Sequence, residues 1–509
     1  MLFGALFSFL RKLMKRFTLL LLLLVTTGIY AQGENVFLSR SFWKSNPSVA
    51  LIKDKINEGH DATALNRYAF DGVVYAILEK ANLESIQYLL SLEGNGVNKI
   101  THDKRTYVFW AAYANNVPLM NYLIANGARM DLKDSHQYSV ATFAAATGKT
   151  NTEIYDLCIQ HGIDLKNDLD GHGAHALLLL LPHVKDLSIL PYFTAKGMHL
   201  EDVDADGNGA FNYVAKTGNT TLLQVLIEKG LPYKKLNNKG ENAFILATRG
   251  SRKGYNSLEF FKYLTGLGLN PAIVSKDGQT ALHNLAYGNK DSETLNYFIE
   301  KGTPVDQQNA EGNTALSNAA RRNNLAIVTL LADKTSNINT ANKKGQTALT
   351  NAIYGNTPEV VAFLLQRGAN AKHLDKKGNS IAYYLVKGYS DRAVDNFDKK
   401  LALLQKQGIA LNQLQANNKT LIHIAVEKNN LNLLKKLTGL KLDINAKDSD
   451  GMTALHRAVM QAKNTKLIKY LLQLGADKKI VTNFGESVYD LAKENEVLRA
   501  QQTDLNFLK

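Results

Sequence analysis

The chain has 509 residues, a formal net charge of +14, eight prolines and one cysteine. One cysteine excludes an internal disulfide, and the absence of a Pro/Ser/Gly-rich linker argues against separate domains, although this length ordinarily forms three or four. The basic excess favours acidic partners such as an acidic protein face, an acidic glycan or an anionic lipid.

Residues 1–31 have the pattern of a secretory signal peptide. Lys15 and Arg16 precede the apolar run 19–25, and an alanine stands at the predicted cut. The run is short for a permanent membrane-spanning helix, so an uncleaved membrane anchor is the weaker alternative. Met14 is an alternative start of the chain.

A secretory signal limits the cellular locations and the partners that we expect for this protein. From Gln32 onward the chain has a net charge of +10, because residues 1–31 contain four basic and no acidic residues. A secreted eukaryotic protein of this size usually has several cysteines, so we expect a periplasmic or secreted protein of a Gram-negative bacterium. Export disfavours nucleic acid as a partner, and after cleavage we expect no stable membrane insertion.

The chain after the signal repeats itself. The residues Gly-Gln-Thr-Ala-Leu-His at 278–283 and Gly-Met-Thr-Ala-Leu-His at 451–456 are the fullest copies, whereas 312–316 and 345–349 lack only the histidine. A period of about 33 residues is typical of a solenoid, whose units stack because none can bury its apolar face alone.

We align the repeats on one turn position in each unit. Successive positions are 32 to 40 residues apart. This register predicts an N-terminal capping partial repeat at 32–71, a repeat array at 72–484 and a C-terminal capping repeat at 485–509. The turn positions are Gly72, Lys104, Gln137, Gly171, Gly207, Gly240, Gly278, Gly312, Gly345, Gly378, Asn418, Gly451 and Gly485.

Each unit has the pattern of two helices. Apolar residues recur at helical spacing in the second helix, as in 467–472 and 360–365. Glycine follows that helix in many units, where a left-handed residue is needed. Threonine precedes the first helix, where its hydroxyl can cap the helix.

Three features could carry chemistry, and each has a plainer explanation. Cys158 lies at a second-helix core position, which indicates a buried hydrophobe rather than a nucleophile. Carboxylates at alternate positions before a glycine resemble the start of a calcium loop, but local turn bonding explains them. Three histidines could bind zinc, but no carboxylate or thiol completes a set. The carboxylates and histidines are Asp202, Asp204, Asp206, His172, His175 and His183.

The repeat residues resemble the ankyrin repeat family, in which a β-turn precedes two antiparallel helices and Thr-Pro-Leu-His opens the first helix. Alanine replaces the family's proline here, a mild change at the first helical position. The resemblance implies an all-α solenoid of about 13 stacked repeats. It also implies that the signature histidines His283, His423 and His456 brace neighbouring turns by hydrogen bonds. The signature threonines, which can cap the first helix, are Thr280, Thr314, Thr347 and Thr453.

In this family, binding residues lie on the concave face after the first helix and at the turn tips. The corresponding positions here are basic and aromatic, and both Tyr and Arg are enriched in protein interfaces. Glu311, Glu427 and Asp277 interrupt the pattern. The concave positions are Tyr113, Lys216, Arg249, Tyr287, Arg321, Arg322, Tyr354 and Lys387, and the tips add Lys276, Lys343, Lys344, Lys376 and Lys377.

Two units are longer than the others. The chain inserts residues around 249–255 and around 388–392, between the two helices of each unit. Such loops contact a partner or tolerate drift. The first insertion is basic and rich in glycine, so we predict a secondary contact site there.

We therefore predict an exported, non-enzymatic scaffold that binds another protein through a basic-aromatic concave face and turn tips, without a cofactor or metal. A binder of acidic glycan or anionic lipid is the first alternative. An enzyme with an unrecognised site is the second, and it is weaker because the repeat register accounts for nearly all residues after 71.

Overall fold

The computed structural model describes residues 35–251 and 253–509. The predicted signal peptide and Arg252 lie outside the described residues. The chain divides into two compact units that meet between Ala210 and Phe211. Within the described residues there are helices and isolated β-bridges but no strand, so the all-α prediction is confirmed.

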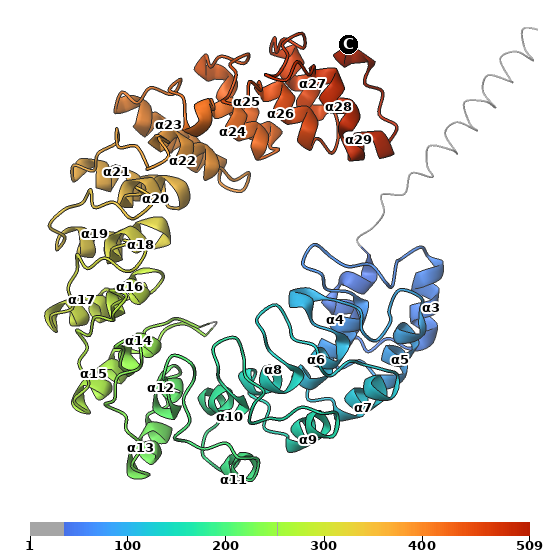
Figure 1. The fold of residues 1–509 in the computed structure, drawn as a ribbon, viewed down its shortest axis with the longest axis vertical. Coiled ribbons are helices and arrows are strands. Elements are labelled where there is room, and N and C mark those ends of the chain that lie inside the picture. Colours follow the sequence, from blue (N-terminus) through green and yellow to red (C-terminus); the bar gives the residue numbers. More distant parts are fainter. Residues whose placement is uncertain (1–34, 252) are drawn as a thin grey trace, which may run out of the picture. The chain divides into compact units, whose positions relative to one another are not determined.

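Unit 1 is a series of short helix pairs (Figure 1). Its elements are η1 (Val36–Leu38), α2 (Arg40–Lys44), α3 (Val49–Asn57), α4 (Gly72–Leu78), α5 (Leu83–Ser91), η2 (His102–Lys104), α6 (Tyr107–Tyr113), α7 (Val117–Ala125), α8 (Val140–Ala146), α9 (Thr152–Gln160), α10 (Ala176–Leu180), η3 (Leu181–His183) and α11 (Leu190–Thr194).

Unit 2 continues the pattern. Its elements are α12 (Ala210–Ala215), α13 (Thr220–Glu228), α14 (Ala243–Ala247), α15 (Leu258–Gly266), α16 (Ala281–Ala286), α17 (Ser292–Glu300), α18 (Ala315–Arg322), α19 (Leu325–Ala332), α20 (Ala348–Gly355), α21 (Pro358–Gln366), α22 (Ile381–Lys387), α23 (Val394–Lys406), η4 (Ala416–Asn418), α24 (Leu421–Glu427), α25 (Leu431–Leu437), η5 (Thr438–Leu440), α26 (Ala454–Gln461), α27 (Lys466–Gln473), α28 (Val488–Glu494), α29 (Glu496–Ala500) and η6 (Asn506–Leu508).

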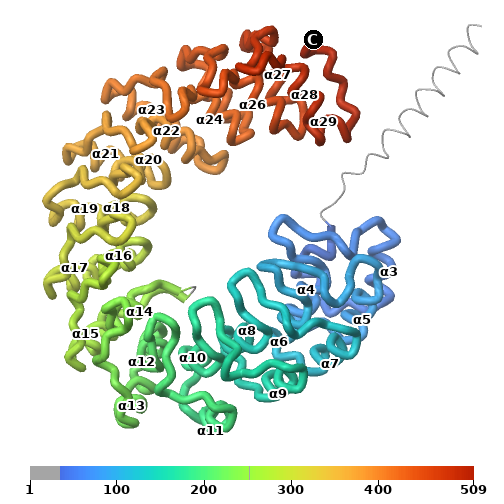
Figure 2. The backbone as a smooth tube through the Cα atoms, in the orientation of Figure 1, coloured from blue at the N-terminus to red at the C-terminus, as the bar shows by residue number. Residues whose placement is uncertain are grey.

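Within each unit the helices form two rows (Figures 1 and 2). The first helices pack on one another, as α18, α20 and α22 do, and the second helices do the same, as α17, α19 and α21 do. Each helix therefore buries its apolar side against the neighbouring repeats, and the predicted solenoid is confirmed. No helix among the described residues is long and apolar enough to span a membrane.

The turn tips of successive repeats are joined by backbone hydrogen bonds. The amide of Lys343 donates to the carbonyl of Glu311 at 2.9 Å, and the amide of Lys376 donates to the carbonyl of Lys344 at 3.0 Å. Gly345 makes this approach possible, because a Cβ there would lie 2.6 Å from the Lys376 nitrogen and its φ is +79°. The turn glycine thus provides a left-handed residue and space for the next tip.

Three of the aligned turn positions carry no glycine, yet they adopt the same conformation. The φ angles of Lys104, Gln137 and Asn418 are +61°, +65° and +57°. A residue with a Cβ is strained in this left-handed conformation, whereas glycine is not. The backbone therefore keeps the repeat register where the sequence has lost its usual marker.

Two of our aligned positions are wrong. Gly72 is the first residue of α4, and the left-handed residue of that turn is Ala69, with φ +59°. In the degenerate repeat before α10, the left-handed residue is Gly173, with φ +77°, and not Gly171. In both cases a glycine near the turn misled the alignment, because the helix start, and not the nearest glycine, defines the register.

In two repeats the signature histidine connects the repeat to the next one. The Thr280 amide donates to His283 Nδ1 at 3.2 Å, and His283 Nε2 lies 2.9 Å from the carbonyl oxygen of Asn313 in the following repeat. His423 contacts the Met452 carbonyl in the same way at 3.1 Å. Burial lowers the pKa of both imidazoles, so they stay neutral at physiological pH. His456 Nε2 has no hydrogen-bond partner among the described residues.

A second connection between repeats uses asparagine. The side-chain amides of Asn323 and Asn356 each donate to carbonyls at the end of the preceding first helix, as Asn356 Nδ2 does to Ala320 at 3.0 Å. In the longer repeat that contains α23, Lys400 Nζ takes this position and donates to the Ile353 carbonyl at 2.9 Å. These bonds satisfy carbonyls that the helix itself leaves unpaired.

The terminal segments also fold as helix pairs. Residues 35–71, where we predicted a partial repeat, contain α2 and α3, which pack against α4 and α5. Phe37 and Trp43 are fully buried there. At the other end α28 packs on α26.

Candidate functional site

The C-terminal end of α18 presents two arginines that diverge toward different repeats. The Arg322 guanidinium lies 4.8 Å from the ring centre of Tyr287 and donates to its hydroxyl at 2.9 Å. The Arg321 guanidinium lies 4.7 Å from the ring centre of Tyr354. Gly355 permits this packing, because a Cβ there would lie 2.6 Å from the Arg321 carbonyl oxygen. The rings hold both guanidinium groups in place at the surface.

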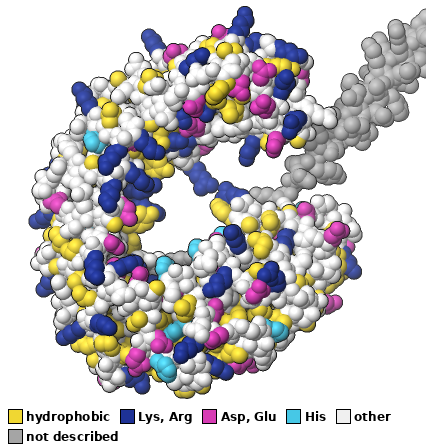
Figure 3. Space-filling view, in the orientation of Figure 1, with side chains coloured by type: hydrophobic (Ala, Val, Ile, Leu, Met, Phe, Trp, Pro, Cys, Tyr) yellow, Lys and Arg dark blue, Asp and Glu magenta, His cyan; other side chains and the backbone are white. Residues whose placement is uncertain are grey.

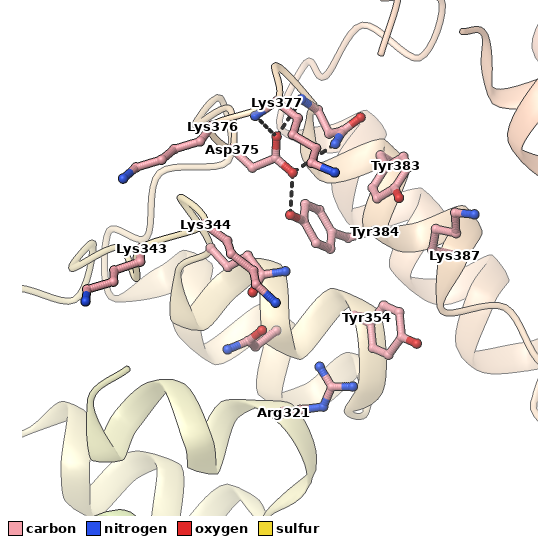
Figure 4. Close-up of a pocket in the computed structure, with 13 residues that line it drawn as sticks. Arg321, Lys343, Lys344, Tyr354, Asp375, Lys376, Lys377, Tyr383, Tyr384 and Lys387 are labelled. Carbon is pink, nitrogen blue, oxygen red and sulfur yellow. Dashed lines mark hydrogen bonds between the residues drawn. The ribbon is translucent and has the colours of Figure 1, made fainter. Parts of the chain in front are cut away.

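Arg321 and Tyr354 form part of a cleft of about 620 Å³, which we name the cationic cleft (Figure 4). It lies between the turn tips and the ends of α18, α20 and α22. Six basic residues and one acidic residue, Asp375, line it. The basic residues are Arg321, Lys343, Lys344, Lys376, Lys377 and Lys387, all of which we predicted as binding residues.

The two lysines of each tip point in different directions (Figure 4). Lys344 and Lys377 extend over the centre of the cleft toward Tyr384, whereas Lys343 and Lys376 extend away from it. All four are exposed, and among the described residues no carboxylate lies within 4.0 Å of their ammonium groups. Each tip therefore offers one inward cation and one outward cation.

Asp375 does not neutralise these lysines by direct contact. Its carboxylate accepts hydrogen bonds from the Tyr384 hydroxyl at 2.6 Å and from the backbone amides of Lys377 and Asn379 at 2.8 and 2.9 Å. Burial opposes ionisation, but the hydrogen bonds outweigh it and hold the pKa of Asp375 below its ordinary value. The carboxylate is thus used to shape the turn.

The far end of the cleft is closer to neutral. Lys387 Nζ lies 3.3 Å from a Glu427 oxygen, and Lys419 Nζ contacts the other oxygen of that carboxylate at 2.5 Å. Lys387 also lies 5.8 Å from the ring centre of Tyr383. The positive charge of the cleft is therefore concentrated at Arg321, Lys344 and Lys377.

A second cleft, of about 480 Å³, lies on the other side of α18. Arg322 and Tyr287 line it together with Arg249 and Tyr255 from the insertion after α14. The insertion lies between two helices, as predicted, and Tyr255 reaches across to Gly288 of the next repeat. Figure 3 shows the Lys and Arg side chains that gather on the inner side of unit 2.

Three predicted binding residues lie outside both clefts. Tyr113, in unit 1, stacks on Phe143, and Lys149 Nζ lies 4.6 Å from its ring centre. Lys216 lies near Tyr213, with 5.9 Å between its Nζ and the ring centre. Lys276 Nζ donates to the Asn238 carbonyl at 2.8 Å.

The carboxylates that resemble a calcium loop serve their own turn. Asp204 Oδ1 accepts the amides of Asp206 and Asn208 at 3.0 and 2.8 Å. Asp202 accepts from the His199 amide at 2.6 Å and lies 3.0 Å from His175 Nε2. Across residues 35–251 and 253–509, no group of three or more His, Cys, Asp or Glu side chains is placed to hold a metal ion.

Cys158 is fully buried in α9. Burial raises the pKa of its thiol, so the thiol stays protonated at neutral pH. Its surroundings are those of a small core side chain.

Comparison with known proteins agrees with the repeat structure. Residues 252–342 and 392–482 match the family model for ankyrin repeats in three copies, and residues 344–376 match the model for a single ankyrin repeat. A viral relative, an ankyrin repeat protein of Acanthamoeba polyphaga mimivirus, is 43% identical over 68 residues, which cover 13% of this chain and 9% of that protein.

Two further relatives resemble parts of the chain. An L-asparaginase of Dirofilaria immitis is 27% identical over 153 residues, which cover 30% of this chain and 25% of that enzyme. The chain thus spans only a quarter of the length of the L-asparaginase and 9% of the length of the mimivirus protein. The crystal structure of the human ASB11 ankyrin repeat domain aligns with 44% of this chain and 97% of that domain, at 22% identity and a TM-score of 0.37.

The family matches fall on the repeats whose turns, capping threonines and bridging histidines are described above. Together with the stacked helix pairs, they identify this chain as an ankyrin repeat protein.

Proposed function

We propose that this chain is an exported scaffold that binds another protein through one face of unit 2. We name this face the basic-aromatic surface; it comprises Tyr287, Arg322, Arg321, Tyr354 and the lysines of the two tips at 343–344 and 376–377. Ankyrin repeats are generally protein-binding scaffolds, which supports a protein partner. The proposal assigns no reaction to the chain.

The observation that carries the proposal is the pairing of each α18 arginine with an exposed tyrosine. Tyr287 and Tyr354 are 46% and 36% exposed although each contacts a guanidinium group. Prepositioned Arg and Tyr side chains lose little conformational entropy on binding and bury a large area. Such residues concentrate binding energy in interfaces.

The sequence pattern of residues 1–31 supports export to the periplasm of a Gram-negative bacterium, or secretion. N-terminal sequencing of the mature protein is expected to begin at Gln32. Detection of residues 1–31 in the mature chain would favour the membrane-anchor alternative.

The proposal is tested by photo-crosslinking in cells of the native host, with a photoreactive amino acid at position 287. We expect one discrete protein adduct, which is lost when Arg321 and Arg322 are both changed to Glu. A native chain that gives no discrete protein adduct, or an adduct that tolerates the charge reversal, would contradict the proposal.

An acidic glycan or anionic lipid surface is the second candidate. It is favoured by the four exposed tip lysines, which are point charges without a fixed fork geometry. Binding to such a surface is expected to fall steeply with salt concentration and to need no single protein. A protein complex that survives 0.5 M salt would argue against it.

A further inference from the structure

Within the basic-aromatic surface, we infer that the cationic cleft binds a short acidic peptide segment of the partner, and that Lys344 and Lys377 contact its carboxylates. This inference rests on the proposed function, because it names the part of the partner that occupies the site. Four observations support it: the excess of positive charge, the fixed register of the two tips, the hydrogen-bonded amides of the tips and the aromatic wall.

The first element is an excess of positive charge, because six basic residues and one ionised carboxylate line the cleft. Arg321, Lys344 and Lys377 line one cleft, and the only acidic residue of its lining already accepts four hydrogen bonds from its own repeat. Like charges held close together repel one another and create a positive potential that is strongest inside a cleft. An anionic partner relieves that repulsion.

The second element is fixed geometry. Lys344 and Lys377 occupy equivalent positions in adjacent repeats, and the Lys376 amide donates to the Lys344 carbonyl at 3.0 Å. This bond locks the two tips in register. The backbones that carry both lysines are therefore placed before the ligand arrives, which reduces the entropy lost on binding.

The third element is that the tips offer no backbone cradle for a phosphate. Phosphate sites commonly use several free backbone amides. Here the amides of Lys344 and Gln346 donate to the Asn342 side chain at 2.9 Å each, and those of Lys377 and Asn379 donate to Asp375. Cations spread over adjacent repeats suit charges that are spread along a chain.

The fourth element is the aromatic wall. Tyr354 and Tyr383 line the cleft, and Tyr354 holds the Arg321 guanidinium against its face. A guanidinium held in one orientation can bind a carboxylate through two parallel hydrogen bonds. The rings also cover apolar stems and peptide backbone, as tyrosines do in protein interfaces. These features favour an acidic peptide over a bare polyanion.

The test measures binding of a fluorescent peptide of ten residues, rich in Glu, to the full chain by anisotropy, with the Gln counterpart as the control ligand. The K344E/K377E variant removes the inward lysines. The K343E/K376E variant makes the same charge change on the same tips, but on the outward lysines. Unfolding midpoints of both variants are measured first, and both are expected to match the native chain because all four side chains are exposed.

We expect K344E/K377E to weaken binding of the Glu peptide by about 30-fold or more and K343E/K376E by about fivefold or less. Equal losses in both variants would overturn the inference, because they would show a general charge effect. Binding of a heparin oligosaccharide or of phosphatidylglycerol vesicles, but not of the Glu peptide, would also overturn it.

Failure of the cleft and failure of the proposed function give different results. If the crosslinked partner of position 287 is still captured by K344E/K377E, the protein scaffold stands and the cleft assignment is wrong. If the native chain captures no protein at all, the proposed function itself is wrong.

Discussion

Unit 1 and unit 2 use basic residues in different ways. In unit 1, Arg105 is buried, pairs with the fully buried Asp134 at 2.6 Å, and lies 4.2 Å from the ring centre of Phe143. Lys99 similarly pairs with the buried Asp71 at 2.9 Å. In unit 2, Lys344 and Lys377 extend over an open cleft without an acidic partner (Figure 4).

The repeats of the two units are therefore held together in two different ways. Unit 2 keeps more of the signature threonine, histidine and glycine than unit 1 does, so its framework needs few charges and its tips are available for a partner. Unit 1 has lost many signature residues, and buried ion pairs connect its repeats instead. A buried, paired cation in unit 1 is therefore expected to affect stability, and a tip cation in unit 2 is expected to affect binding.

The largest predicted effect is that of Arg105→Met in unit 1. It leaves the Asp134 carboxylate buried without its partner, so we expect a loss of about 3–5 kcal/mol in the free energy of unfolding. Trp43 and Trp110 are the only tryptophans of the chain, and both lie in unit 1. Urea unfolding followed by tryptophan fluorescence therefore reports on this unit.

Arg129→Met is the matched control for that prediction. Arg129 pairs with Asp131 at 2.7 Å, but their side chains are 57% and 67% exposed. We expect a much smaller loss than for Arg105→Met, because water and salt screen an exposed ion pair. Equal effects of the two substitutions would remove the distinction between framework and surface cations.

Lys400 is an exception in unit 2, because it is a buried cation that connects two repeats. It is 5% exposed, and burial lowers the pKa of its ammonium group from 10.5 to about 8. This difference corresponds to about 3 kcal/mol of destabilisation at neutral pH. Unfolded Lys400 holds its proton up to pH 10.5, so the native chain should gain stability as the pH rises from 8 to 10.5.

Lys400→Met removes the titrating group and leaves an unbranched apolar side chain that is one atom shorter. We expect the variant to be more stable than the native chain at pH 7, because no charge is buried. The lost hydrogen bond to the Ile353 carbonyl reduces this gain by about 1 kcal/mol. Its advantage should shrink between pH 8 and 10.5, as measured by hydrogen exchange of α20 and α23. A difference that does not change with pH would show that Lys400 does not titrate in this range.

Substitutions at the turn positions are expected to have effects of opposite sign in the two units. Gly345→Ala places a Cβ 2.6 Å from the Lys376 nitrogen, in a residue with left-handed backbone. We therefore expect the free energy of unfolding to fall by about 2–3 kcal/mol, which is measured as faster hydrogen exchange in α20 and α22.

Gln137→Gly is expected to raise the free energy of unfolding by at most about 1 kcal/mol, as measured by unfolding followed with tryptophan fluorescence. Glycine removes the strain of the left-handed residue, but it also gives the unfolded chain more conformational freedom. Destabilisation by Gln137→Gly would contradict the strain argument.

Much of the fold could be predicted from the sequence, because a local motif repeated at a constant spacing defines both the helix pairs and their stacking. Most of the cationic cleft could be predicted as well, because its tip lysines lie in register from repeat to repeat. The direction of each lysine could not, since it depends on the neighbouring tip. The divergence of Arg321 and Arg322 could not be predicted either, because it depends on the close contact between the ends of α18 and α20 that Gly355 allows.

Other features were missed because they join residues that no single repeat contains. Lys400 lies in a lengthened second helix, and only the structure shows that it reaches the Ile353 carbonyl of the preceding repeat. The Asn323 and Asn356 bonds do have a sequence signal, namely asparagine at the same place between the two helices of adjacent repeats. Tyr383 was missed because it precedes the position that the family resemblance marks for binding.

The most direct test of the account measures stability and partner capture on the same two variants, Arg105→Met and Lys344→Met/Lys377→Met. We predict that the lysine variant keeps the native unfolding midpoint but loses the crosslinked partner of position 287 or binds the Glu peptide at least about tenfold more weakly. We predict that Arg105→Met loses stability by about 3–5 kcal/mol and, while folded, still binds that peptide. A lysine variant that unfolds as easily as Arg105→Met, or that binds both ligands like the native chain, would contradict the division between framework and binding cations.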